Sequence, residues 1–123
     1  MSNKKKLQVL LCDDSAYSRS RIGKILQSLD CDIVAEAEDA ETSVKLFREK
    51  KPDLVIMDLV LRASTGQDAI SEIFVVDSSA KIVVVTILND QETLDRVKEL
   101  GVSDIVNKKH VDRDLPDAIN SLF

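Results

Sequence analysis

Charged and hydroxyl side chains follow the ends of four apolar segments in this 123-residue sequence. They are Asp13 and Asp14 after the first segment, Asp58 after the third, Thr86 after the fourth and Lys108 after a weaker fifth. If the segments are strands of one open parallel sheet, their carboxyl ends border a single crevice, where such sheets bind ligands. Three carboxylates in one crevice repel one another unless a cation is bound, and an all-oxygen site suits Mg²⁺. The pattern therefore predicts a magnesium site for phosphoryl transfer.

The residue types in this set suggest a role for each member. A carboxylate can attack phosphorus when a metal ion and a cation screen it from the incoming anion. Asp58 stands alone and is the best candidate nucleophile, whereas the pair Asp13 and Asp14 suits metal binding. Lys108 would supply fixed positive charge, and the Thr86 hydroxyl would donate to phosphoryl oxygens. Any one aspartate could instead be a helix cap or a turn residue, so the prediction depends on the whole set.

The apolar segments themselves predict the fold. Strands are expected over residues 7–12, 33–35, 54–57 and 82–85, with a weaker one at 105–106. Nearly continuous apolar runs indicate strands covered on both faces, as in parallel sheets. Between them, apolar residues recur at helical spacing, for example Ile22, Leu26 and Leu29. Five alternations of strand and helix predict a doubly wound α/β fold.

Capping residues and helix breakers support these boundaries. Ser15 suits the start of the first helix, and Pro52 follows the second. Gly101 stands where the fourth should end, and Pro116 suits the first turn of the last. The chain shows no repeats, low-complexity tracts or linker, so we expect a single domain over residues 1–123.

Composition excludes several classes of protein. With 22 acidic residues against 17 Lys and Arg, the chain carries a formal charge of −5, which argues against direct nucleic-acid binding. Its apolar runs are too short to span a bilayer. The lysines at positions 4–6 resemble the start of a signal peptide, but Asp13 and Asp14 soon interrupt the apolar run after them. Cys12 and Cys31 have no partners at metal-ligand spacing. A cytoplasmic protein without a membrane anchor is therefore expected.

Several segments together resemble the receiver domains of two-component response regulators, particularly the single-domain chemotaxis type. The matching segments cover nearly the whole chain and lie at 9–16, 51–58, 82–86 and 101–108, with a glycine at Gly66. The resemblance implies a flavodoxin-like (βα)5 fold with a five-stranded parallel sheet in the order 2-1-3-4-5.

The resemblance also implies functional roles for particular residues. Asp58 would be the phosphoacceptor, Asp14 a direct Mg²⁺ ligand and Asp13 a ligand acting through water. The backbone carbonyl of Val60 would complete the metal site. Thr86 and Lys108 would contact the phosphoryl group.

A signalling switch is the function that follows from this resemblance. A histidine kinase or phosphotransfer protein would phosphorylate Asp58, and the face formed by the fourth helix, fifth strand and fifth helix would then bind a downstream protein. The chain would catalyse only its own phosphorylation and dephosphorylation and would not otherwise be an enzyme. It would act as a monomer or a phosphorylation-dependent dimer.

Two loops depart from the family pattern. Receivers commonly have a proline four residues after the phosphoacceptor, where this chain has Arg62, so that loop could be differently shaped. The family lysine is normally followed by a proline in cis geometry, whereas Lys109 follows Lys108 here. Because a non-proline cis bond costs about 2.5–4 kcal/mol, we expect a trans bond and a displaced loop. Either lysine could then point into the site.

Three further positions bear on signalling. Ile105 occupies the position of a switching Tyr or Phe, so we expect the signal to pass through Thr86, Ile87 and the following helix. Val60 and Leu88 occupy the positions that usually tune the lifetime of the phosphorylated state. Neither side chain can hydrogen-bond an attacking water, which predicts slow self-dephosphorylation.

Other functions remain as alternatives. A pseudo-receiver would keep the fold and bind partners without phosphorylation, as the departures at Arg62, Lys109 and Ile105 allow. An aspartate-based phosphatase would need a second Asp where this chain has Val60. A flavodoxin-like electron carrier would need Ser, Thr and Gly clusters after the first strand. The last two fit poorly.

Overall fold

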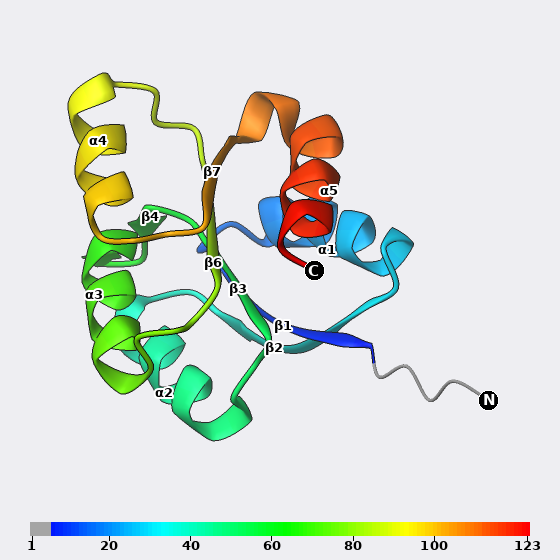
Figure 1. Cartoon of the computed structure of the whole chain (residues 1–123), viewed down its shortest axis with the longest axis horizontal. Coiled ribbons are helices and arrows are strands. Elements are labelled where there is room, and N and C mark those ends of the chain that lie inside the picture. The colour runs from blue at the N-terminus through cyan, green and yellow to red at the C-terminus, as the bar shows by residue number, and fades with distance from the viewer. Residues whose placement is uncertain (1–5) are drawn as a thin grey trace.

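The computed structural model describes residues 6–123, so Lys4 and Lys5 of the leader lie outside the described residues. The five longer strands alternate with helices along the chain (Figure 1). The strands are β1 (Leu7–Cys12), β2 (Cys31–Ala37), β3 (Leu54–Met57), β4 (Val60–Leu61), β5 (Ser64–Thr65), β6 (Ile82–Thr86) and β7 (Asp104–Asn107). The helices are α1 (Ala16–Ser28), α2 (Ala40–Lys50), α3 (Gly66–Val76), α4 (Gln91–Glu99) and α5 (Val111–Leu122), with a 3₁₀ helix, η1 (Lys108–His110), before α5. None of the described helices is long and apolar enough to cross a bilayer.

The five longer strands form one parallel sheet in the order β2-β1-β3-β6-β7. Numbered among themselves, these strands have the order 2-1-3-4-5, so the predicted fold class and topology are confirmed. β2 and β7 extend beyond the segments expected at 33–35 and 105–106. Both are edge strands, and β2 includes exposed polar residues, Asp32 and Glu36, which interrupt the apolar pattern.

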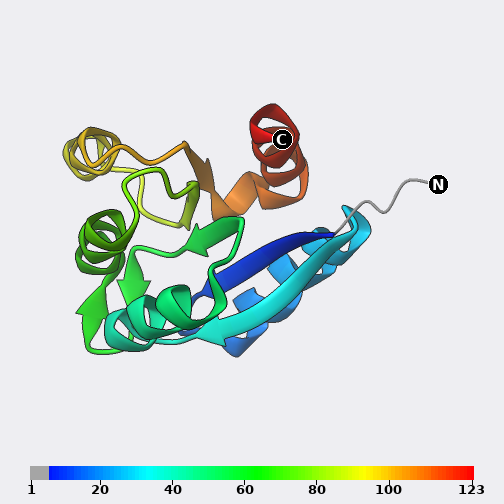
Figure 2. The same cartoon turned by 60° about the horizontal axis from the view of Figure 1, so that its bottom comes forward.

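Helices cover both faces of the sheet. Helices α1 and α5 pack on one face, whereas α2, α3 and α4 pack on the other (Figures 1 and 2). Successive residues of β3 alternate between the two layers, with Val55 in the core beneath α2–α4 and Ile56 in the core beneath α1 and α5. Because both faces of each central strand are buried, the strand sequences are apolar throughout.

A small antiparallel hairpin, which the sequence pattern did not predict, follows Asp58. In it β4 pairs with β5, and Arg62 and Ala63 form the connecting turn, with Ala63 at a φ of 52°. A positive φ at the second central residue of a turn is the left-handed conformation that L-residues adopt less readily than glycine. Gly66 follows directly, and a Cβ atom there would collide with the backbone of Asp58 and Leu59. The glycine therefore lets the hairpin lie tightly against the end of β3.

One predicted helix boundary is wrong. Ser15 caps α1, and Gly101 follows α4, as expected. Pro116, however, lies inside α5 and not in its first turn, because the helix already begins at Val111. Val111 and Leu115 are buried against the sheet, and η1 leads directly into the helix. Pro116 has no N–H to bond the carbonyl of Asp112, an exposed residue, and losing this one hydrogen bond costs less than losing the burial.

Candidate functional site

Five polar residues meet at one edge of the sheet. Asp13 and Asp14 follow β1, Asp58 follows β3, Thr86 is the last residue of β6, and Lys108 follows β7. All lie at the carboxyl ends of neighbouring parallel strands. This placement brings together residues that are distant in sequence.

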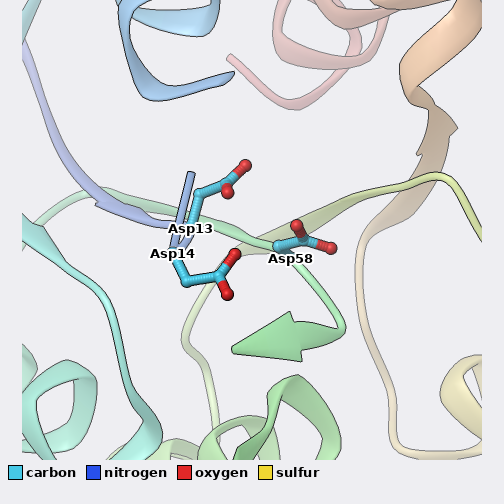
Figure 3. A group of neighbouring side chains, drawn as sticks. All are labelled: Asp13, Asp14 and Asp58. Carbon is cyan, nitrogen blue, oxygen red and sulfur yellow. The ribbon is translucent and has the colours of Figure 1, made fainter. Parts of the chain in front are cut away.

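The three aspartates form a compact acidic pocket. One carboxylate oxygen from each of Asp13, Asp14 and Asp58 lies within 4.8 Å of the others (Figure 3). Asp13 and Asp58 are buried, at 1% and 4% exposed, whereas Asp14 is more accessible. Mg²⁺ prefers hard oxygen ligands and retains several waters, so this donor set fits the ion.

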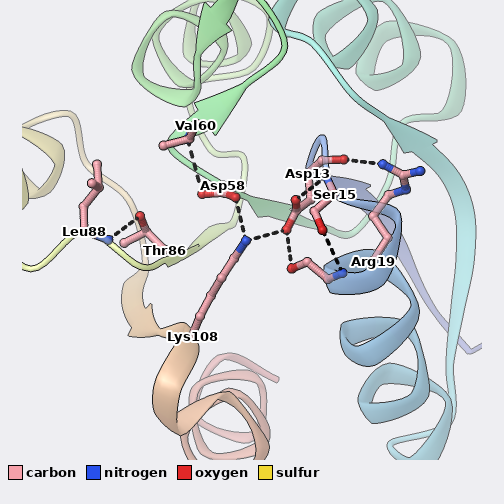
Figure 4. Close-up of polar contacts among 9 residues, drawn as sticks. Asp13, Ser15, Arg19, Asp58, Val60, Thr86, Leu88 and Lys108 are labelled. Carbon is pink, nitrogen blue, oxygen red and sulfur yellow. Dashed lines mark hydrogen bonds and ion pairs between the residues drawn. The ribbon is translucent and has the colours of Figure 1, made fainter.

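Lys108 is the cation of the pocket. Its Nζ donates to Asp58 Oδ2 at 2.7 Å and forms an ion pair with Asp13 Oδ2 at 2.9 Å (Figure 4). Lys109 is exposed. No peptide bond in the described chain is cis, so the bond between the two lysines is trans, as expected. The structure therefore selects Lys108 as the lysine that enters the pocket.

The charge balance of the pocket shifts the pKa values of both partners. Burial raises the pKa of the Asp58 carboxyl, and the lowering effect of the Lys108 ammonium does not fully offset it. Burial opposes the charged form of Lys108, but its hydrogen bonds to Asp58 and Asp13 outweigh burial and raise the pKa of the ammonium. Three carboxylates around one ammonium favour added positive charge, whether from a proton or from a metal ion.

Residues of α1 and the turn before it hold Asp13 in place. The Ser15 N–H donates to Asp13 Oδ1 at 2.9 Å, and the Ser18 hydroxyl donates to Oδ2 at 2.6 Å. Arg19 Nη1 donates to the Asp13 backbone carbonyl at 2.6 Å (Figure 4). Ser18 and Arg19 were not predicted from the sequence. Their spacing from Asp13, in the first turn of α1, is the only feature that could have suggested them.

The remaining candidates border the pocket. The Val60 N–H donates to Asp58 Oδ1 at 3.2 Å, and the Val60 residue is 46% exposed. Thr86 is fully buried, and its Oγ1 accepts the Leu88 N–H at 3.1 Å (Figure 4). Ile105 packs against the core beneath α2–α4. Thr86 thus links the pocket edge to the segment that precedes α4.

An open cleft of about 360 Å³ adjoins Lys108. Two of its apolar residues, Tyr17 and Ile87, are 79% and 65% exposed. Arg21 and Lys109 also line it. The cleft therefore presents apolar and basic side chains beside the acidic pocket.

Comparisons with known proteins agree with the fold. The family described as "Response regulator receiver domain" matches residues 9–120. The Chemotaxis protein CheY of Halobacterium salinarum is 33% identical over 94% of this chain and 96% of its own length. Protein CcdB of Bacillus subtilis is 30% identical over 94% of this chain and 97% of its own length.

Among solved structures, a LuxR-family two-component response regulator from Aurantimonas sp. SI85-9A1 superposes with a TM-score of 0.90 at 29% identity. The match covers 96% of this chain and 85% of that one. The chain belongs to the response regulator receiver family. It is a CheY-like receiver domain with an acidic cluster able to hold a metal ion.

Proposed function

We propose that this receiver is a phosphorylation-activated signalling switch in which Asp58 accepts a phosphoryl group from a histidine kinase or phosphotransfer protein. The observation that supports it best is the contact of Lys108 Nζ with both Asp58 and Asp13. A buried carboxylate held against a fixed cation, beside two further carboxylates, is suited to receiving an anionic group.

The reaction forms one bond and breaks another. An oxygen of Asp58 attacks phosphorus, the P–N bond of the donor phosphohistidine breaks, and the released imidazole nitrogen takes a proton from water. Lys108 and the Thr86 hydroxyl contact the phosphoryl oxygens as charge builds there. Asp13, Asp14, Asp58 and the Val60 carbonyl would hold Mg²⁺, which would neutralise charge on the carboxylates and the phosphoryl group. The chain catalyses only its own phosphorylation and dephosphorylation.

The partners are proteins. The exposed Tyr17 and Ile87 beside the pocket support docking of a protein donor. The downstream partner binds the face formed by α4, β7 and α5. The switch acts in the cytoplasm, as a monomer or as a phosphorylation-dependent dimer, without contacting nucleic acid or membrane.

Mass spectrometry tests this proposal. The chain is incubated with Mg²⁺ and a small phosphodonor, with and without a chelator. We expect one added phosphoryl mass on the unchanged chain and on Asp32→Asn, an exposed control in β2, but none on Asp58→Asn. An unmodified wild-type chain would favour the pseudo-receiver alternative.

A further inference from the structure

Four charged residues form a chain of ion pairs along one side of the acidic pocket. We call them the Arg–Glu brace: Arg19 of α1, Glu36 of β2, Glu38 after β2 and Arg62 in the β4–β5 turn. None of them belongs to the set of carboxylates and cations in the pocket. Their contacts connect the end of β1 to the β4–β5 hairpin.

Arg19 is the buried end of the brace. Its side chain is 16% exposed, and Nη1 donates to the Asp13 carbonyl at 2.6 Å. Its other nitrogens pair with two glutamates, Nε with Glu36 Oε1 at 3.2 Å and Nη2 with Glu38 Oε1 at 3.2 Å. Arg19 therefore joins the backbone at the end of β1 to Glu38.

Arg62 is the other end of the brace and contacts Glu38 twice. Arg62 Nη1 pairs with Glu38 Oε2 at 2.9 Å, and the Arg62 N–H donates to the Glu38 carbonyl at 2.9 Å. Arg62 lies two residues after Val60, whose N–H donates to Asp58. One glutamate carboxylate thus connects the hairpin to Arg19 and, through Arg19, to Asp13.

We propose that Arg62 is a positioning residue for the metal site. Through Glu38 and Arg19, it holds the β4–β5 hairpin at a fixed distance from the end of β1. The backbone segments that carry Val60 and Asp13 are then ordered before any ion binds, which lowers the cost of arranging the proposed ligands. This role rests on the proposed function, because it assumes that the pocket binds Mg²⁺.

The direction of the change in Mg²⁺ affinity when Arg62 is replaced separates a positioning role from a purely electrostatic one. Arg62 is a positive charge near a cation site, so its field alone weakens Mg²⁺ binding. Removing that charge without a loss of positioning would tighten binding. Removing a positioning residue would weaken it. The two explanations therefore predict opposite changes for one substitution.

Magnesium titration calorimetry at low ionic strength provides the test. Arg62→Met keeps the backbone hydrogen bond and removes the ion pair, and we expect its Mg²⁺ affinity to fall about two- to fivefold, the range for a partly exposed pair. Arg62→Lys should restore most of the affinity. Arg48→Met is the matched control. Arg48 is exposed in the last turn of α2, far from the helix start that follows Glu38, and it forms no ion pair within residues 6–123.

Each outcome of the titration decides one question. Mg²⁺ binding by Arg62→Met that equals or exceeds that of the unchanged chain would overturn the positioning role while leaving the metal site intact. An equal loss of Mg²⁺ affinity in Arg48→Met would also overturn the positioning role, because Arg48 does not contact the brace. Failure of the unchanged chain to bind Mg²⁺ would overturn both this inference and the proposed function. Nuclear magnetic resonance shifts at the Val60 amide would show whether the hairpin moves in Arg62→Met without Mg²⁺.

Discussion

Asp58 is a buried carboxylate whose charge is offset, among the described residues, by the single ammonium of Lys108. Its pKa is raised by burial and by the Asp13 carboxylate, so folding favours its protonated form. The stability contributed by the protonated Asp58 carboxyl is fully present below the unfolded-state pKa. It is lost as the pH rises through the folded-state pKa. At pH 7 the ionised Asp58 therefore destabilises the metal-free chain.

We predict that Asp58→Asn is more stable than the wild type at pH 7 without metal. The melting temperature should rise by roughly 3 °C, and the difference should shrink as the pH falls toward 3.8, the ordinary aspartate value. Thermal unfolding in a chelating buffer at several pH values measures this, with Asp32→Asn as control. A lower melting temperature for Asp58→Asn at pH 7 would mean that the ionised Asp58 carboxylate stabilises the fold.

Val60 and Leu88 occupy the two positions that usually tune the lifetime of the phosphorylated state in the receiver family. Val60 is half exposed beside Asp58, and Leu88 is partly buried two residues after Thr86. Neither can orient a water molecule toward phosphorus. We predict that Val60→Asn combined with Leu88→Glu speeds dephosphorylation at least about tenfold, because a polar group can then assist the attacking water. Decay of the phosphorylated species over time measures the rate, and equal rates would refute the prediction.

At the scale of single elements, η1 determines which lysine enters the pocket. Asn107 precedes η1, and its Oδ1 accepts the Lys109 N–H at 2.8 Å. The proline that commonly occupies position 109 in the family has no N–H, so this cap depends on the departure to lysine. The cap fixes the backbone that directs Lys108 toward Asp58.

We predict that Asn107→Ala slows phosphorylation of Asp58 by a small phosphodonor about fivefold. This factor corresponds to the free energy of one lost helix cap, about 1 kcal/mol. Asn107→Ser keeps a cap acceptor and should recover most of the rate. Initial rates at saturating donor measure the effect, with Asn120→Ala in α5 as control. An unchanged rate in Asn107→Ala would show that Lys108 needs no help from this cap.

The sequence predicted the five sheet strands because their central members are continuous apolar runs. It did not predict β4 and β5, since two-residue strands carry no periodicity. It placed five polar residues at one sheet edge. It did not decide whether Lys108 or Lys109 points into the pocket, because that depends on the conformation of η1. Arg19 and Glu38 were missed, and the ion pair of Arg62 was not predicted, for a related reason. Their contacts exist only after β2 and the hairpin are brought together.

Helix α4 buries the fewest residues of the α-helices in the described chain. Only Val97 of its residues is buried, whereas α2 buries four residues. Thr86 connects the pocket to this helix through Leu88. If the Thr86 hydroxyl moves toward a phosphoryl group, as the proposed function requires, we expect α4 to respond at little energetic cost.

We predict that beryllium trifluoride, a phosphoryl mimic, alters amide hydrogen exchange most over residues 87–99. Helix α2 serves as the internal reference because it is well packed. Hydrogen exchange with and without the mimic measures the difference, and Thr86→Ala should abolish the change in α4. A response confined to residues around Asp58 would show that the signal does not pass through Thr86.

For the molecule as a whole, the net charge of −5 matters less than the concentration of negative charge at one site. Asp13, Asp14 and Asp58 meet only when β1 and β3 pair, so the unfolded chain has no comparable cation site. A divalent cation that binds only the folded state stabilises it by mass action. Metal binding and global stability are therefore linked through the sheet.

We predict that Mg²⁺ at a hundred times its dissociation constant raises the free energy of unfolding by about 2.7 kcal/mol. Asp14→Asn should lose most of this gain. Asp14 is the most exposed of the three carboxylates, so its substitution disturbs the core least. Urea unfolding in MgCl₂ and in NaCl of equal ionic strength separates specific binding from screening, since screening acts alike in both salts. Equal stabilisation by the two salts, or full stabilisation of Asp14→Asn, would mean that the three carboxylates do not act together as a metal site.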